Sequence, residues 1–232
     1  MLFLKKDIQV FTLPKAGSTS IALWHARNLS LWCARQNPNL TNERIEVDIH
    51  QIFPNLSFED AVSTFKEDNE VTKVAVIRDP LRRLLSAYGN RIIHHQDLKR
   101  IEPKKLLGRA KFYLNNPKFK THPRPDEFFK NLELYQSVSP GILHHTRSCK
   151  HFLGSNLGHF DHIFQLEDIS KFEKFLSNKM NMPVNLPREQ TGGPKIKLNE
   201  LRRETIEIIL EHLEKDYIFL QKFYKLPVNP FL

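Results

Sequence analysis

The residues of this sequence best suited to chemistry form a short run that follows the first apolar segment. Ile8–Leu13 has the character of a buried strand, and Pro14–Ser20 leads from it into a helical pattern over residues 21–34. Glycine in such a turn lets the backbone approach a ligand, while the first N–H groups and the dipole of the helix favour an anion. The run is typical of a phosphate site, and a capped turn without a ligand is the alternative interpretation.

The order of residues within the run separates two kinds of phosphate site. Lys15 brings a compact positive charge before the only glycine, and three hydroxyl side chains follow that glycine. A Walker A loop instead has its lysine directly after the last glycine and before serine or threonine. No acidic residue of the Walker B type ends the apolar strand at 74–77 either, because Arg78 ends it. The pattern therefore indicates an anion bound without a metal ion and counts against nucleotide hydrolysis with Mg²⁺.

A second pair of candidate anion ligands lies on the next clear strand and helix. Val74–Ile77 is the clearest buried strand of the sequence, and the Asp-Pro after Arg78 is typical of the start of a helix, here expected over residues 81–93. A guanidinium binds phosphate through two parallel hydrogen bonds, and Ser86, two turns into the helix, can face the same ligand. A charge at a buried strand end needs a partner, which favours a bound anion at Arg78.

Other arginines of this helix are open to two interpretations. Arg82 or Arg83 could assist the binding of phosphate from the same stretch of chain. A solvated basic face is the alternative for Arg82, Arg83 and Arg91, and we expect it for at least one of them.

Together the two motifs resemble those of the sulfotransferases that use 3′-phosphoadenosine 5′-phosphosulfate (PAPS). Pro14–Ser20 is similar to the 5′-phosphosulfate loop of the carbohydrate branch, which includes Golgi-type enzymes and bacterial relatives. Arg78 and Ser86 take by position the roles that hold the 3′-phosphate, and the resemblance places Lys195 in a loop over the adenosine. The donor-binding residues that it implies are Lys15, Ala16, Gly17, Ser18, Thr19, Ser20, Arg78, Ser86 and Lys195.

The resemblance implies an in-line attack by an acceptor hydroxyl on the sulfuryl group of PAPS, with PAPS as co-substrate and no metal. Lys15 is suited to stabilise the charge that develops on the leaving phosphate. The hydroxyl must lose a proton, so a general base is expected within hydrogen-bond reach. His50, at the end of a predicted strand over residues 44–49, is the candidate base. Alternatives for this role are Asp48, His25, His94 and His95.

Strands that alternate with helices predict an α/β fold. We expect one domain over residues 1–232, a P-loop-like three-layer arrangement with a central, mainly parallel sheet flanked by helices. Residues 94–150 are polar, basic and rich in Pro and Asn, so we expect an acceptor-side insertion of long connections with one helix. Later elements are expected as a strand at 162–166 and helices at 126–135, 169–178 and 198–223. The last helix is expected to bury Leu201, Ile208, Ile209, Leu213, Tyr217 and Leu220.

The composition is that of a soluble globular protein, with 40% hydrophobic and 26% charged residues. The net charge of +9 favours an anionic partner such as nucleic acid, a lipid surface, a phosphorylated cofactor or an acidic glycan. Cys33 and Cys149 form neither a disulfide framework nor a zinc pattern. Without a membrane-spanning stretch or signal peptide, a cytoplasmic protein is expected, or a Golgi-lumenal one if the sequence is trimmed from a longer eukaryotic chain.

The acceptor is expected to be a carbohydrate or glycolipid hydroxyl, because the loop is of the carbohydrate type. Basic side chains of the middle segment could bind an anionic acceptor or form a solvated surface: Lys104, Lys105, Arg109, Lys111 and Arg124. A P-loop kinase is an alternative that the position of Lys15 opposes. Nucleic acid is not expected as a partner, because no aromatic platform is interleaved with the basic residues. A non-catalytic relative that binds PAP or a glycan is the third alternative.

Overall fold

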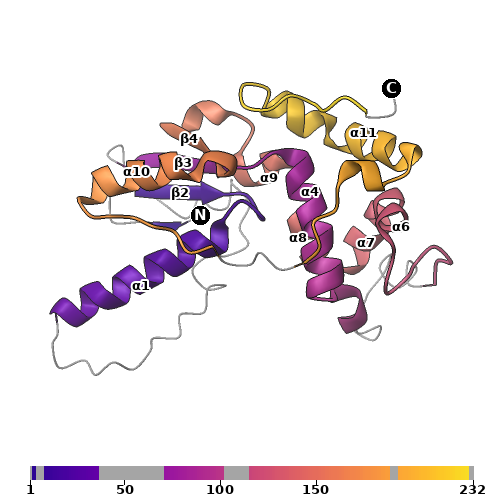
Figure 1. Ribbon diagram of the computed structural model, residues 1–232, viewed down its shortest axis with the longest axis horizontal. Helices are drawn as coiled ribbons and strands as arrows, with labels where there is room; N and C mark the ends of the chain where they lie inside the picture. The colour runs from indigo at the N-terminus through magenta and orange to yellow at the C-terminus, as the bar shows by residue number, and fades with distance from the viewer. Residues whose placement is uncertain (1, 4–7, 37–70, 102–114, 189–192, 230–232) are drawn as a thin grey trace. The chain divides into compact units, whose positions relative to one another are not determined.

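The structure is a computed structural model that describes residues 2–3, 8–36, 71–101, 115–188 and 193–229 (Figure 1). The chain forms two compact units, Met1–Arg78 with Lys150–Thr191 and Asp79–Cys149 with Gly192–Leu232. The first unit holds the β-sheet and the second is helical. The expectation of a single domain stays a prediction.

The first unit is built on a four-stranded sheet in the order β1-β2-β3-β4. Its strands are β1 (Leu2–Phe3), β2 (Ile8–Thr12), β3 (Thr72–Ile77) and β4 (His162–Gln165). Strands β2, β3 and β4 run parallel, and β1 pairs antiparallel with β2. The predicted α/β fold with a mainly parallel sheet is confirmed.

Two helices cover one face of this sheet, α1 (Ser18–Gln36) and α10 (Ile169–Met180) (Figure 1). Because side chains alternate along a strand, the same face of β2 and β3 presents Ile8, Val10, Val74 and Val76, all fully buried. They form one cluster with residues of the two helices, namely Ile21, Trp24, Phe172 and Leu176. On the opposite face the ring of Phe11 lies 5.2 Å from that of Phe160. Burial on both faces is the usual condition of a parallel sheet.

The second unit begins with α4 (Pro80–Tyr88), which continues without a break as a π-helix over Gly89–His94. The helix predicted over residues 81–93 is therefore confirmed, with an unexpected change of hydrogen bonding at Gly89. Its predicted apolar stripe is buried in the core of this unit: Leu84, Leu85, Tyr88 and Ile92.

The middle segment is more helical than the sequence led us to expect. The described residues contain α6 (Pro125–Lys130), α7 (Leu132–Val138), α8 (Pro140–Thr146) and α9 (Cys149–Leu153). The helix predicted at 126–135 is confirmed as α6 and α7, whereas α8 and α9 replace the expected long connections, so that expectation was wrong over this stretch. Pro125 and Pro140 open helices, since proline is well suited to the first helical position, and Ser139 accepts a capping bond from Ile142 N–H at 3.3 Å.

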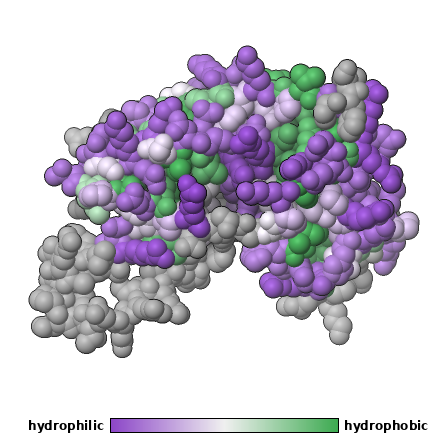
Figure 2. Space-filling view, viewed as in Figure 1, coloured by the Kyte–Doolittle hydropathy of each residue, from purple (hydrophilic) through white to green (hydrophobic). Residues whose placement is uncertain are grey.

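The last helix, α11 (Arg203–Phe219), is shorter than the predicted 198–223 because Leu198–Glu200 forms a separate 3₁₀ turn. Five of the six residues expected in its core face are buried, but Ile208 is 39% exposed. Ile208 precedes Ile209 by one position, which turns its side chain about 100° around the helix. Among the described helices, none is long and apolar enough to cross a membrane. Figure 2 shows mostly hydrophilic side chains on the visible face, with apolar patches between them.

Candidate active site

The backbone between β2 and α1 forms a tight turn held by hydrogen bonds. Leu13 N–H donates to the Val76 carbonyl oxygen at 3.5 Å, and Ala16 N–H donates to the Leu13 carbonyl oxygen at 3.0 Å. The carbonyl of Gly17 then accepts from Ile21 N–H at 3.0 Å, so the hydrogen bonding of α1 begins at Gly17. The strand, turn and helix predicted around this glycine are confirmed.

Two residues of the turn have left-handed backbone conformations. Gly17 has a φ of 81°, and a Cβ added to it would lie 3.0 Å from Cδ1 of Leu166. The backbone conformation therefore favours glycine at this position, and a Cβ would also force the end of the Leu166 side chain to move slightly. Lys15 has a φ of 67°, which is uncommon for a residue with a Cβ. Such conformations cost free energy and gather at ligand sites, where the surrounding structure holds them.

Arg78 contacts this turn from the neighbouring strand. Its Nη1 donates to the carbonyl oxygen of Lys15 at 2.8 Å. The contact follows from the sheet, since β2 and β3 are parallel with Thr12 opposite Val76, and their carboxyl ends meet at one edge. The structure thus brings together Lys15 and Arg78, which the sequence predicts as ligands for different phosphates of one donor.

The hydroxyl residues of the run lie in the first turn of α1. Ser18, Thr19 and Ser20 are half-buried, whereas Ala16 is fully buried beneath the turn. The first N–H groups of a helix lack intrahelical partners, and the helix dipole adds partial positive charge. Together with Lys15 and Arg78, this end of α1 is an electropositive edge of the sheet that can hold an anion without a metal.

Ser86 belongs to the second unit and is half-buried on α4. The start of α4 is fixed by Asp79, whose Oδ1 accepts from Arg82 N–H at 2.8 Å. The Tyr217 hydroxyl donates to Asp79 Oδ2 at 2.9 Å and accepts from Leu81 N–H at 3.2 Å. Burial first, and the Asp79 carboxylate second, raise the pKa of Tyr217. Sequence reasoning placed Tyr217 only in the core and missed this role, because its partner lies 138 residues away.

Arg83 is neither a solvated side chain nor a phosphate ligand. It is 1% exposed, and its Nη2 lies 3.3 Å from Asp216 Oδ2 and donates to the Arg147 carbonyl at 2.5 Å. Oδ1 of Asp216 accepts from Ser148 Oγ at 2.7 Å and from Cys149 N–H at 2.8 Å. The suggestion that Arg83 assists phosphate binding was wrong, because its charge is enclosed with a carboxylate inside the second unit.

The other two arginines of this stretch differ from Arg83. Arg82 is exposed, as expected for a solvated face. Arg91 is half-buried and donates from Nε and Nη2 to the carboxylate of Asp97 at 2.7 and 2.9 Å. Nearby, burial raises the pKa of the Cys149 thiol to about 12, so this cysteine stays protonated at neutral pH.

The candidate base His50 and its alternative Asp48 lie outside the described residues. Of the remaining alternatives, His25 is half-buried on α1, and burial lowers its pKa, which keeps the imidazole neutral and able to accept a proton at pH 7. His94 and His95 lie at the end of the π-helix in the second unit, with ring centroids 4.8 Å apart. The assignment of the base stays a prediction.

Lys195 is exposed in an extended segment that precedes the 3₁₀ turn of the second unit. Of the basic residues expected on the acceptor side, Arg124 is described, and the other four lie outside the described residues: Lys104, Lys105, Arg109 and Lys111. Arg124 is 75% exposed and lies 3.3 Å from Glu127, which Lys120 also contacts at 2.6 Å. The Lys120 hydrogen bond is the main reason that the pKa of Glu127 falls to about 2.

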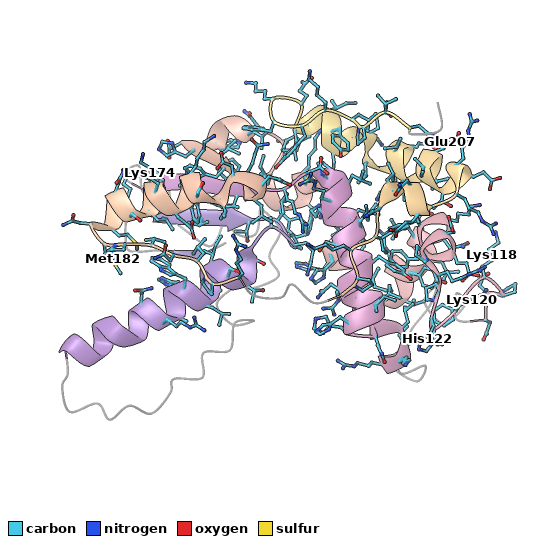
Figure 3. All side chains as sticks on the ribbon, in the orientation of Figure 1. Lys118, Lys120, His122, Lys174, Met182 and Glu207 are labelled. Atoms are coloured by element: carbon cyan, nitrogen blue, oxygen red, sulfur yellow. The ribbon has the colours of Figure 1, made fainter. Side chains whose placement is uncertain are left out.

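A basic surface runs through the segment before α6. Lys118, Lys120 and His122 are exposed there and are labelled in Figure 3. Beside it the second unit has a shallow pocket of about 380 Å³. Lysine, amide, aromatic and aliphatic side chains line this pocket, among them Lys118, Lys130, Asn116, Asn131, Phe129 and Ile208.

A parallel sheet whose strand end meets a glycine turn, a helix N-terminus, a lysine and an arginine defines an α/β protein of the phosphate-binding class. A model of the sulfotransferase family matches residues 4–225, most of the 232-residue chain. The chain therefore belongs to the sulfotransferase family, whose members are PAPS-dependent transferases. No curated protein and no solved structure was found to match it.

Proposed function

We propose that this enzyme moves the sulfuryl group of PAPS to a hydroxyl of a carbohydrate or glycolipid. The main observation behind the proposal is the hydrogen bond from Arg78 to the Lys15 carbonyl, in the turn that connects β2 to α1. It brings the Arg78 guanidinium to the backbone of Lys15, in the turn that leads to the N-terminus of α1, and a donor with phosphate groups is suited to such cationic residues beside a helix N-terminus.

In this proposal the 5′-phosphosulfate binds along residues 15–20. N–H groups and hydroxyls of the first turn of α1 donate to its oxygens, and the Lys15 ammonium lies beside the bridging oxygen. Arg78 and Ser86 bind the 3′-phosphate and Lys195 contacts the adenosine, as the family resemblance implies. Ser86 and Lys195 belong to the second unit, and their contact with the donor rests on the sequence.

The reaction is an in-line displacement at sulfur. The acceptor oxygen forms the new S–O bond while the bond between sulfur and the 5′-phosphate oxygen breaks, leaving 3′-phosphoadenosine 5′-phosphate (PAP). The hydroxyl proton passes to a general base, for which we propose His50. Lys15 stabilises the charge on the departing phosphate, so its effect is largest in the transition state.

A carbohydrate acceptor is supported by the type of the loop and by the second unit. Its pocket combines an aromatic ring with amide and ammonium groups, which suits a ligand that has apolar ring faces and many hydroxyls. Lys120 and Arg124 share a single carboxylate, that of Glu127, so together with Lys118 they keep an excess of positive charge, which favours an acceptor with negative charge. Transfer assays with neutral and acidic oligosaccharides of matched length test this preference, and equal rates with both would contradict it.

Thermal-shift titration with PAP, and in parallel with ATP and Mg²⁺, tests the donor. We expect PAP to raise the melting temperature without metal, because a ligand that binds only the folded state stabilises it. Stabilisation by ATP with Mg²⁺ alone would overturn the proposal in favour of a kinase. PAP binding without sulfate transfer to any acceptor would instead indicate a non-catalytic relative.

Lys15→Ala tests the role of the lysine in the same assays. We expect kcat to fall about 100- to 1,000-fold, the usual effect of removing one charge-stabilising donor. Lys174→Ala is the matched control, because Lys174 is an exposed lysine of α10 in the same unit (Figure 3). Full activity of Lys15→Ala would contradict the role given to this residue.

A further inference from the structure

Two glycines of the second unit bring distant backbone segments into direct contact. Gly89 is the first residue of the π-helix, and Gly193 and Pro194 lie in the segment that leads to α11. A Cβ added to Gly89 would lie 2.6 Å from the carbonyl oxygen of Pro194, closer than real Cβ contacts come. A Cβ added to Gly193 would overlap the carbonyl oxygen of Gly89 and lie 2.7 Å from its carbonyl carbon. Figure 1 shows this segment beside the helix.

The backbone of Gly89 gives no other reason for a glycine. Its φ of −56° and ψ of −38° are ordinary helical values that any residue adopts, and glycine is less favourable than alanine in a helix. Gly193, by contrast, has a φ of 99°, which favours glycine for its conformation as well. At Gly89 the close approach of Pro194 is therefore the reason for glycine, and the contact is backbone against backbone.

The contact of Gly89 with Gly193 and Pro194 lies next to the two residues of this unit that the proposed function assigns to donor binding. Ser86 precedes Gly89 by three positions, so both lie on neighbouring turns of one helix face. Lys195 follows Pro194 directly. The change from α-helix to π-helix also occurs at Gly89, and such changes are frequent at functional sites.

We propose that Gly89 and Gly193 are positioning residues for PAPS: their contact holds the segment with Lys195 against the helix turn that carries Ser86. The inference rests on the proposed function. Ser86 and Lys195 then act as one rigid group, so the protein recognises the 3′-phosphate and the adenosine together. A side chain at residue 89 separates the two segments and loosens this recognition.

The test compares the dissociation constants of PAP and AMP, which differ by the 3′-phosphate, for the wild-type chain and for Gly89→Ala. We expect the preference for PAP to fall about tenfold in Gly89→Ala, the effect of losing a hydrogen bond to a charged group. A loss of stability alone weakens the binding of PAP and of AMP equally and leaves the ratio of their dissociation constants unchanged. An unchanged ratio in folded Gly89→Ala would overturn the inference.

Gly141→Ala is the matched control, because Gly141 is a helical glycine of the same unit. A Cβ there would meet the side-chain ends of Asp97 and Arg91 at 2.7 and 2.8 Å, which can move, and not a backbone. We expect its ratio to equal that of the wild type. A wild-type chain that binds AMP as tightly as PAP would contradict the proposed function itself, which distinguishes the two failures.

If Gly89→Ala does not fold, Ser86→Ala and Lys195→Ala decide the question, because neither adds atoms at the contact. Residues of one rigid group have coupled effects on binding, whereas independent residues have additive ones. We expect the double variant to lose much less PAP affinity than the product of the single losses. Strict additivity would overturn the inference.

Discussion

Arg78 at the sheet edge and Arg83 between helices are five residues apart in sequence and have opposite surroundings. Arg78 is half-buried, and its Nη1 donates to the carbonyl oxygen of Lys15 at 2.8 Å. Arg83 is fully buried and lies 3.3 Å from the carboxylate of Asp216. A half-buried guanidinium at the sheet edge can reach a ligand, whereas the enclosed guanidinium of Arg83 can only stabilise the fold.

The largest effect is expected from breaking the buried pair. Arg83→Ala leaves Asp216 without its cation, which should lower the free energy of unfolding by about 3–5 kcal/mol. Urea denaturation followed by circular dichroism measures it. Arg82→Ala, an exposed neighbour, should change stability by no more than about 0.5 kcal/mol. Similar values for the two variants would show that the Arg83 pair does not stabilise the second unit.

Arg78→Ala should have the opposite effect to Arg83→Ala, a large loss of ligand binding and a small loss of stability. We expect PAP affinity to fall about 10- to 100-fold, as for a lost hydrogen bond between charged groups, with a smaller change in stability than in Arg83→Ala. Isothermal titration calorimetry with PAP and thermal unfolding of the same sample separate the two effects. If the variant lost stability but kept its PAP affinity, Arg78 would be, like Arg83, a residue that stabilises the fold and does not bind the donor.

Gly17→Ala tests whether the turn at the sheet edge depends on the left-handed conformation of its glycine. The left-handed φ should destabilise the variant by about 1–2 kcal/mol, because an added Cβ conflicts with that conformation. Contact with Leu166 adds to this effect. Thermal unfolding checks the expectation, with Gly158→Ala as control, since the nearest atom there is the end of the Asn156 side chain at 3.1 Å. Equal stability of both variants would contradict it.

The smallest effect is expected at the start of α4. Tyr217→Phe removes the hydroxyl that contacts Asp79 and Leu81, and we expect a loss of about 1 kcal/mol, the net value of a typical hydrogen bond. Chemical denaturation of Tyr217→Phe and of Asp79→Asn forms a double-mutant cycle with the combined variant. Additive losses would show that the two side chains do not interact energetically.

The sheet edge was largely predictable because its signals are local. The apolar runs of β2 and β3, the glycine turn and the Asp-Pro at the start of α4 each lie within a few neighbouring residues. The environment of Arg83 was not predictable, since Asp216 is 133 residues away and an arginine beside Arg82 has the sequence pattern of a solvated face. The helix that opens at Pro125 was predicted, but the one that opens at Pro140 was missed, because proline also marks loops and only the packing of the following turns distinguishes the two cases.

The hydrogen bond between Arg78 and the Lys15 carbonyl has a consequence for the thermodynamics of donor binding. It forms within the fold, so the entropy lost in ordering the turn belongs to folding and not to association. A preorganised turn of this kind needs little rearrangement when the phosphosulfate arrives, and more of the interaction energy is observed as affinity. Calorimetry of PAP binding should therefore show a less unfavourable entropy for the wild type than for Arg78→Ala.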